Sequence, residues 1–204
     1  MEDMLKKEGS ENNSIVIYFV TKNKGKYREV SELAKEYGIY VKMLGIEKLE
    51  IQSDDIREIA LFSARWVINK IGKDIPIVVE DAGLFINALN GFPGPYSSYV
   101  YKTLGVDGIL KLLNGIENRY AYFKAVAVLE HPELGEHVFE GVVYGKIVYE
   151  PRGYGGFGFD PIFMPEGIER TFAELSPLEK NRFSHRARAF RSLFEWIRSR
   201  FSKA

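Results

Sequence analysis

The sequence predicts an α/β protein built on a mixed sheet. Over the first 80 residues, short apolar runs of strand type alternate with segments of helical periodicity, which is typical of parallel strands joined by helices. From residue 120 onward, two long β-rich stretches are separated by a short turn, which indicates an antiparallel hairpin. The chain has 204 residues, 46% of them hydrophobic and 14% aromatic, enough for one large core. We therefore expect a single domain over residues 14–204, with the hairpin in a second lobe, preceded by a flexible tail at 1–13.

Charge and composition exclude several classes of protein. The 28 Lys and Arg residues equal the 28 Asp and Glu residues, so the chain lacks the basic excess of a protein that coats nucleic acid. Cysteine is absent, which excludes disulfide scaffolds, thiolate metal sites and cysteine nucleophiles. The sequence shows neither the run of about 18 apolar residues of a membrane span nor a signal peptide. We expect a cytoplasmic protein with neither nucleic acid nor a membrane as partner.

Three strands and two helices are predicted in the first half of the chain. Residues 15–20 form an apolar, β-branched run, and a helix follows from Lys26 to Tyr37, where Gly38 ends it. The next elements are a strand at 40–44, a helix at 56–71 and a buried strand at 76–79. The third strand is expected to end just before two acidic residues.

The second half combines short helices, the hairpin and two capped helices. Each is predicted from turn residues, alternation or capping patterns. These elements are a Gly/Pro turn at 91–95, short helices at 97–104 and 106–113, strands at 120–131 and 137–149, a glycine and aromatic loop at 151–160, and helices beginning after Ser176 and Ser184.

The loop after the first strand is a candidate phosphate site. Lys22, Lys24 and Lys26 surround Asn23 and Gly25 directly before a helix, where free N–H groups and the helix dipole favour anions. It is not a P-loop, because the leading glycine is missing and no Ser or Thr follows the last lysine. The alternative is a solvated surface turn.

Acidic residues near the third strand are candidate metal ligands. Glu80 and Asp81 follow this strand, and ligand sites of open α/β sheets lie beyond the carboxyl ends of strands. With Glu50, they could hold Mg²⁺ or activate a water molecule. The alternative for Asp81 is an Asx turn with Gly83.

The last third of the chain carries candidate ligand-binding side chains. Lys180 lies in one capped helix, and His185 and Arg186 open the next one, which suits an oxygen-rich ligand. Phe157 and Phe159 could stack on a nucleobase. The alternatives are an arginine-rich helix with a solvated face, and aromatic rings that fill the core. Together the four groups suggest a nucleotide.

At these residues the sequence resembles the inosine triphosphate pyrophosphatases, a family that hydrolyses inosine, deoxyinosine and xanthosine triphosphates to the monophosphate and pyrophosphate. The resemblance extends from about residue 15 to residue 197. It rests on five ordered blocks: Thr21-Lys22-Asn23-Lys24-Gly25-Lys26, Glu80-Asp81-Ala82-Gly83-Leu84, Gly91-Phe92-Pro93-Gly94 with Tyr96-Ser97-Ser98, Gly156-Phe157-Gly158-Phe159-Asp160-Pro161-Ile162-Phe163, and Thr171 through Lys180 to Ser184-His185-Arg186.

The resemblance implies an elongated mixed-sheet fold with two lobes around a central cleft, a homodimer, and a role for each block. Asp81 is implied as general base and, with Glu50, as a magnesium ligand, with Glu80 as a further ligand or an acid behind them. The implied substrate contacts are Thr21, Lys22, Asn23, Lys24, Gly25, Lys26, Ala82 and Lys180 near the phosphates, Phe157, Gly158, Phe159 and Asp160 as the platform for the base, and His185 and Arg186 at its 6-oxo edge.

The chain departs from the family pattern at three places. Ala82 stands where relatives carry Ser or Thr, so one hydroxyl contact is lost. Ser63 stands where many bacterial relatives have a helix lysine, and Lys22 and Lys24 replace the commoner Gly and Pro of the phosphate loop.

Three other functions remain as alternatives. The closest in chemistry is a Maf-like pyrophosphatase of modified pyrimidine nucleotides, against which the histidine and arginine block argues. The others are a nucleotide sensor without turnover and an RNA-binding protein that uses the arginines of the last helix.

Overall fold

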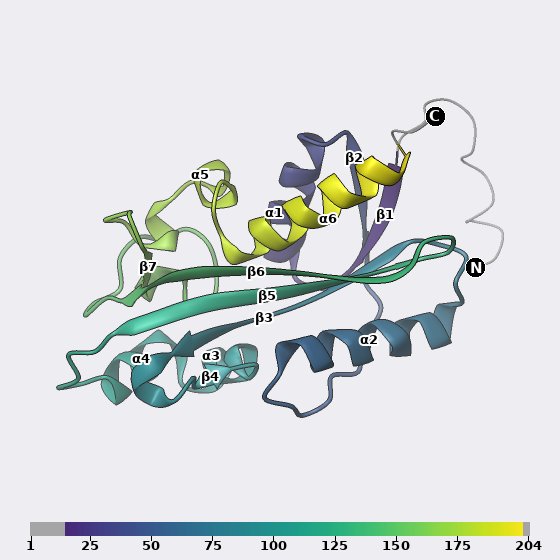
Figure 1. Ribbon diagram of the computed structural model, residues 1–204. Coiled ribbons are helices and arrows are strands. Elements are labelled where there is room, and N and C mark those ends of the chain that lie inside the picture. The colour runs from purple at the N-terminus through teal and green to yellow at the C-terminus, as the bar shows by residue number, and fades with distance from the viewer. Residues whose placement is uncertain (1–14, 202–204) are drawn as a thin grey trace.

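The computed structural model describes residues 15–201, and the tail predicted at 1–13 lies outside these residues. Seven strands form one mixed sheet in the order β2-β1-β3-β5-β6-β7, with β4 paired to β3 (Figure 1). The sequence prediction of an α/β mixed sheet is confirmed. In residues 15–201, no helix is long and apolar enough to cross a membrane.

The parallel part of the sheet comes from the N-terminal half. β1 (Ile15–Val20) lies between β2 (Ile39–Leu44) and β3 (Ile77–Ile86), parallel to both. β1 is apolar throughout because helices cover both faces of this part of the sheet.

β3 is longer than the sequence pattern indicated, and this corrects the expectation that Glu80 and Asp81 follow a strand. Both lie inside a ten-residue strand, because the partner β5 continues beside β3 from Ile77 to Ile86. On the other edge, β1 pairs with β3 only as far as Val79, and the pairing of β3 with β4 (Pro93–Gly94) begins at Leu84. Among the described strands, residues 80–83 therefore pair with β5 alone, which leaves a gap in the sheet.

The hairpin of β5 (Tyr120–His131) and β6 (Gly135–Ile147) extends along the whole molecule (Figure 1). β7 (Phe163–Pro165) adds to its far edge. The hairpin was predicted, although β6 begins and ends two residues earlier than expected. The expectation that the hairpin lies in a second lobe is wrong, because β5 packs in the apolar clusters of both ends of the sheet. The length of the hairpin lets one sheet carry two groups of helices with the gap between them.

Three helices cover the end of the sheet that holds the parallel strands. α1 (Lys24–Lys35) and α6 (His185–Phe201) lie on one face, and α2 (Ile56–Ile71) lies on the other (Figure 1). α2 has the predicted bounds, whereas α1 begins two residues before the predicted start because Asn23 caps it. The apolar stripe of α6 packs as expected, with the Phe190 ring edge-on to Phe19 at 5.3 Å.

The other end of the sheet forms the second lobe around a separate apolar cluster. The capping box of Ser176 and Glu179 and the Ser184 cap are both present, as predicted. The remaining elements are the helices α3 (Ser97–Thr103), α4 (Gly105–Leu112) and α5 (Pro177–Asn181), with 3-10 turns η2 (Asn87–Leu89), η3 (Asp160–Ile162) and η4 (Phe172–Glu174).

Gly141 of β6 allows α6 to lie directly on the sheet. A Cβ atom there would stand 2.1 Å from the His185 carbonyl oxygen and 2.6 Å from the Ala189 nitrogen. Both are backbone atoms of α6 and cannot move alone. We expect Gly141→Ala to lower the free energy of unfolding by about 1–3 kcal/mol, because it overpacks this contact.

Urea denaturation measures this change, with Gly45→Ala as the matched control. A Cβ atom at Gly45 meets nothing within 4 Å, so this control should stay within about 0.5 kcal/mol of the wild type. Equal stability of the two variants would contradict the account of how α6 is held.

Candidate active site

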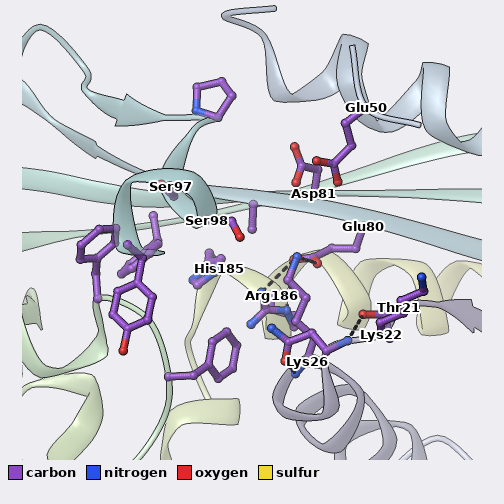
Figure 2. Close-up of a pocket in the computed structure, with 18 of the residues that line it drawn as sticks. Thr21, Lys22, Lys26, Glu50, Glu80, Asp81, Ser97, Ser98, His185 and Arg186 are labelled. Carbon is purple, nitrogen blue, oxygen red and sulfur yellow. Dashed lines mark hydrogen bonds and ion pairs between the residues drawn. The ribbon is translucent and has the colours of Figure 1, made fainter. Parts of the chain in front are cut away.

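A cavity of about 670 Å³ lies beside the gap in the sheet, within the size range of small-molecule sites. Residues from the β1–α1 loop, β3, the loop after β2, α3, the 157–160 loop and the start of α6 line it. Figure 2 shows Thr21, Lys22 and Lys26 at one end, with His185, Ser97 and Ser98 farther along. The predicted site residues therefore meet across both lobes.

The alternation of β3 sends its two acids to opposite faces of the sheet. Val78 packs with α1 and α6, and Val79 packs with α2. Glu80 continues the first face, where Lys26 and Arg186 bind it. Asp81 continues the second face, and Figure 2 shows it beside Glu50. The two adjacent carboxylates thus have different surroundings, and Asp81 is not in the Asx turn weighed as its alternative.

The phosphate loop is folded by its own side chains. The Asn23 side chain caps α1 by accepting from Gly25 N at 2.8 Å and Lys26 N at 3.0 Å. Thr21 Oγ1 accepts from the backbone nitrogen of Asn23 at 3.0 Å. The expectation that helix N–H groups are free for phosphate is corrected for these two, because Asn23 already occupies them. Phosphate binding would then depend on side chains that line the cavity, such as Lys26.

Glu80 joins the phosphate loop to α6. Its Oε2 lies 2.7 Å from Lys26 Nζ, and its Oε1 lies 3.0 Å from Arg186 Nη2. The Glu80 side chain is fully buried. Burial alone would raise the pKa of Glu80, but the charges of Arg186 and Lys26 outweigh burial and lower the pKa to about 2. With both oxygens engaged, Glu80 is not brought to Glu50 and Asp81 as a third metal ligand.

The ionic contacts continue from Arg186 to Asp160. Arg186 Nη1 lies 2.6 Å from Glu29 Oε2, and Lys180 Nζ lies 2.8 Å from Glu29 Oε1 and 2.6 Å from Asp160 Oδ2. Asp160 also accepts from the Phe157 nitrogen at 2.8 Å, which fixes the glycine loop. With Lys26 and Glu80 included, the chain contains three cations and three carboxylates, so their formal charges cancel.

The burial of this chain has opposite effects on its two other acids. For Glu29, burial raises the pKa, but Arg186 and Lys180 outweigh it and the pKa is lowered. For Asp160, burial prevails over Lys180 and the pKa is raised. Removing one partner of such a buried ion pair leaves an uncompensated charge and destabilises the fold.

Glu50 and Asp81 form the acidic side of the cleft. Burial raises the pKa of Asp81, and the nearby Glu50 charge adds to this effect against Lys48 and Lys26. Burial also raises the pKa of Glu50, but Lys48 outweighs it and the pKa is lowered. Within residues 15–201, no group of three or more His, Cys, Asp or Glu side chains is arranged to hold a metal ion.

Two facing carboxylates nevertheless fit Mg²⁺. This ion keeps several water molecules and is commonly held by one or two protein carboxylates together with substrate phosphates. Glu50 and Asp81 offer oxygen donors of like charge, and repulsion by Glu50 adds to the larger effect of burial in raising the pKa of Asp81. A cation between them would relieve that repulsion.

Aromatic side chains line the cavity from the phosphate loop to α3. The Phe157 ring lies over Gly25, where a Cβ atom would approach it to 2.7 Å, and Arg186 lies 5.4 Å from the ring centroid. The Phe159 ring is buried and meets Tyr101 edge-on at 5.5 Å. Phe157 is therefore the ring better placed to stack on a base, whereas Phe159 forms part of the wall.

His185 lines the cavity and carries an unpaired buried polar atom. Its ring stacks on Phe123 at 4.7 Å with an interplanar angle of 11°, and its buried Nδ1 has no hydrogen-bond partner in the described structure. Burial, with the charge of Arg186, holds the pKa of His185 well below its usual range, so the imidazole is neutral at pH 7. Arg186 uses three of its five N–H groups on Glu80 and Glu29. A ligand with complementary edges would satisfy the groups that remain.

Most of the predicted site residues line one cavity. Those that do are Thr21, Lys22, Asn23, Lys26, Glu50, Glu80, Asp81, Ala82, Phe157, Gly158, Phe159, Asp160, Lys180, His185 and Arg186. Lys24 and Gly25 do not line it: Lys24 is exposed on the first turn of α1, and Gly25 makes room for the Phe157 ring.

The arginines of α6 are mostly held by the protein itself, which argues against an RNA-binding face. Arg188 donates to the carbonyl oxygens of Phe183 and Val142, and Arg191 pairs with Glu36 at 3.1 Å. Arg186 is buried in the cleft.

Sequence reasoning missed two charged residues of the site. Glu29 follows Lys26 by three residues, so both share one face of α1. This spacing was the signal that the sequence offered. Lys48 lies between β2 and α2, 2.7 Å from Glu50 Oε1. Its segment has no helix or strand periodicity, so no sequence signal placed it.

The fold and the cleft define an α/β protein whose site suits an anionic ligand with an aromatic ring. The profile of the Ham1 family matches residues 17–196. The chain is 51% identical over 180 residues to the dITP/XTP pyrophosphatase of Thermococcus kodakarensis, which covers 88% of this chain and 96% of the relative. It is 49% identical over 183 residues to the dITP/XTP pyrophosphatase of Hyperthermus butylicus, with 90% and 95% covered. The chain belongs to the Ham1 family.

Solved structures agree with this assignment. A HAM1 protein from Coxiella burnetii matches with a TM-score of 0.78 and 32% identity, over 91% of this chain and 99% of that one. A nucleoside-triphosphatase, dITP/XTP pyrophosphatase, from Mycobacterium abscessus matches with a TM-score of 0.67 and 33% identity, over 88% and 98%. The predicted family and its fold are confirmed.

The buried ionic chain makes Lys180 a test of stability. Lys180→Met leaves Glu29 and Asp160 buried without their shared cation, and we expect a loss of about 3–5 kcal/mol in the free energy of unfolding at pH 7. The loss should shrink toward pH 4. In the variant, Asp160 without a cation and Glu29 with Arg186 alone take up protons, while Glu29 of the wild type, whose pKa is lowered, begins to lose its contribution below 4.5. Denaturation at several pH values measures both effects.

Lys35→Met is the matched control. It removes the same charge from an exposed pair whose Nζ–Oε1 distance to Glu32 is 2.7 Å, so it should cost no more than about 0.5 kcal/mol. A pH-independent loss in the Lys180 variant, or equal losses in both variants, would contradict the ionic chain.

Proposed function

We propose that this protein hydrolyses deaminated purine nucleoside triphosphates, namely ITP, dITP and XTP, to the monophosphate and pyrophosphate, and so removes them from the nucleotide pool. The observation that carries the proposal is that one cleft brings the charged side chains of Lys26 and Asp81 together with the rings of Phe157 and His185. Relatives about 50% identical over most of the chain bear the name dITP/XTP pyrophosphatase.

The phosphates are proposed to bind at the end formed by the β1–α1 loop. A triphosphate carries about four negative charges that must be offset before water can attack. Lys26 and Lys22 line this end. Lys22 is largely exposed, and its Nζ lies as far as 3.8 Å from Oε1 of its partner Glu47, so this pair is loose. Lys180 lines the cavity as well, but its two carboxylate partners direct it first to positioning the 157–160 loop.

Asp81 is proposed as the general base. It is the buried carboxylate on the face of β3 that Glu80 does not share, and burial raises its pKa, which makes it a better proton acceptor than an exposed aspartate. It would orient a water molecule toward the α-phosphorus and take its proton, while pyrophosphate leaves.

The base is proposed to be read at its 6-oxo edge. Hypoxanthine and xanthine present an oxygen acceptor there, whereas adenine presents an amino donor. Arg186 has two guanidinium N–H groups left after its contacts with Glu80 and Glu29, and the neutral His185 ring lies beside it. An amino group facing these donors would leave buried groups unpaired, at a cost on the order of 1–3 kcal/mol each.

We include Mg²⁺ as the cofactor, with Glu50 and Asp81 as its protein ligands. When bound, the ion would offset phosphate charge and polarise the reacting phosphate. We also propose that the protein acts as a cytoplasmic homodimer, as the family resemblance implies, and that residues 14–204 form one nucleotide pyrophosphatase domain. The shared sheet of all described strands supports the single domain.

Product analysis with Asp81→Asn tests the proposal. In Mg²⁺, the wild type should convert dITP to the monophosphate and pyrophosphate, and Asp81→Asn should lower kcat about 10³-fold because it removes the base. The fold should be unchanged, because asparagine has nearly the same size.

Asp55→Asn is the matched control. Asp55 caps α2 by accepting from Arg57 N at 2.8 Å, asparagine caps equally well, and Asp55 does not line the cavity. Near-normal turnover by Asp81→Asn would remove Asp81 from the mechanism. Release of orthophosphate would contradict attack at the α-phosphorus, and nucleotide binding without turnover would favour a sensor.

A further inference from the structure

Lys48 brings a positive charge into the acidic side of the cleft. Its Nζ lies 2.7 Å from Glu50 Oε1 and donates to the Glu80 carbonyl oxygen at 3.3 Å, and only 18% of its side chain is exposed. Burial lowers the pKa of Lys48, but the charges of Asp81 and Glu50 outweigh burial and raise it. The Lys48 ammonium is therefore held by the Glu50 carboxylate and by the backbone of β3 next to Asp81.

The segment that carries Lys48 is fixed beside α2. Residues 45–55 contain neither helix nor strand, yet the buried Ser63 of α2 donates from Oγ to the Leu49 carbonyl oxygen at 2.8 Å. Leu49 separates Lys48 from Glu50, so this bond holds both charged residues at the cavity. The serine at position 63 thus contributes to the geometry of the acidic side.

Three other cations of the cleft are held by carboxylates that are not proposed as metal ligands. Arg186 and Lys180 each contact two acids, and Lys26 contacts Glu80. Lys48 differs because its carboxylate partner is one of the two proposed magnesium ligands. An ion bound to Glu50 and Asp81 would face this ammonium at close range, and like charges in a partly buried site repel strongly.

We propose that Lys48 is a resident counter-cation of the Glu50–Asp81 pair: it holds these carboxylates in the nucleotide-free protein, weakens their affinity for Mg²⁺, and gives up Glu50 when the metal enters. The incoming phosphates offer the displaced ammonium a new partner. Metal and nucleotide binding are thereby coupled, because the metal displaces the Lys48 ammonium from Glu50 and the phosphates give this ammonium a new partner. This inference rests on the magnesium site of the proposed function.

Titration calorimetry of Mg²⁺ into the nucleotide-free full-length protein tests the inference. Lys48→Met keeps the apolar stem of the side chain but removes its charge, and we expect roughly ten-fold tighter Mg²⁺ binding. Lys48→Arg keeps the charge and should bind Mg²⁺ within about two-fold of the wild type. Lys35→Met removes an equal charge from a surface pair outside the cleft and should also leave the affinity unchanged.

Unchanged or weaker Mg²⁺ binding by folded Lys48→Met would overturn the inference. Circular dichroism establishes that the variant is folded, and Lys48→Arg provides a second comparison, because an affinity gain equal to that of the methionine variant would show that charge is not the cause. Metal binding is measured without turnover, so the two proposals fail separately. Absence of pyrophosphate from dITP would refute the function alone. Turnover of dITP by the wild type, together with an unchanged Mg²⁺ affinity in Lys48→Met, would refute the role of Lys48 alone.

Discussion

The buried carboxylate of Glu80 is the contact on which the cleft depends. It binds Lys26 of α1 through one oxygen and Arg186 of α6 through the other, with no exposed surface of its own. Without Glu80, Lys26 would lose its carboxylate partner and Arg186 would keep Glu29 alone, which is costly for charges at this depth. Glu80 therefore sets the distance between the phosphate loop and the edge where we propose the base is read.

A gap in the sheet makes this arrangement possible. β3 loses β1 after Val79 and gains β4 at Leu84, so the residues between them face a cavity on one edge while β5 holds them on the other. Strand alternation then assigns Glu80 to the ionic chain and Asp81 to the acidic pair with Glu50. Two neighbouring residues thus have separate surroundings, one in the ionic chain and the other in the acidic pair for which we propose the chemistry.

The sequence predicted local elements well and long-range charge pairing poorly. The bounds of α2, the Ser176 capping box and the hairpin follow from periodicity and caps, which act over a few residues. The extent of β3 depends on β5, some 40 residues later in the chain, and Glu29 meets Lys180 across 151 residues. The candidate site residues were predicted from strand ends, helix starts and the family blocks. Lys48 lies in a segment without helix or strand periodicity and could not be placed without the structure.

The central claim is that Glu80 couples the two ends of the cleft, and kcat/KM for dITP and dATP in Glu80→Gln tests it most directly. Because glutamine cannot pair with both cations, we predict that kcat/KM for dITP falls and that the preference for dITP over dATP also falls, by about ten-fold. A fall in kcat/KM with the base preference intact would show that the two ends work independently and would contradict the account.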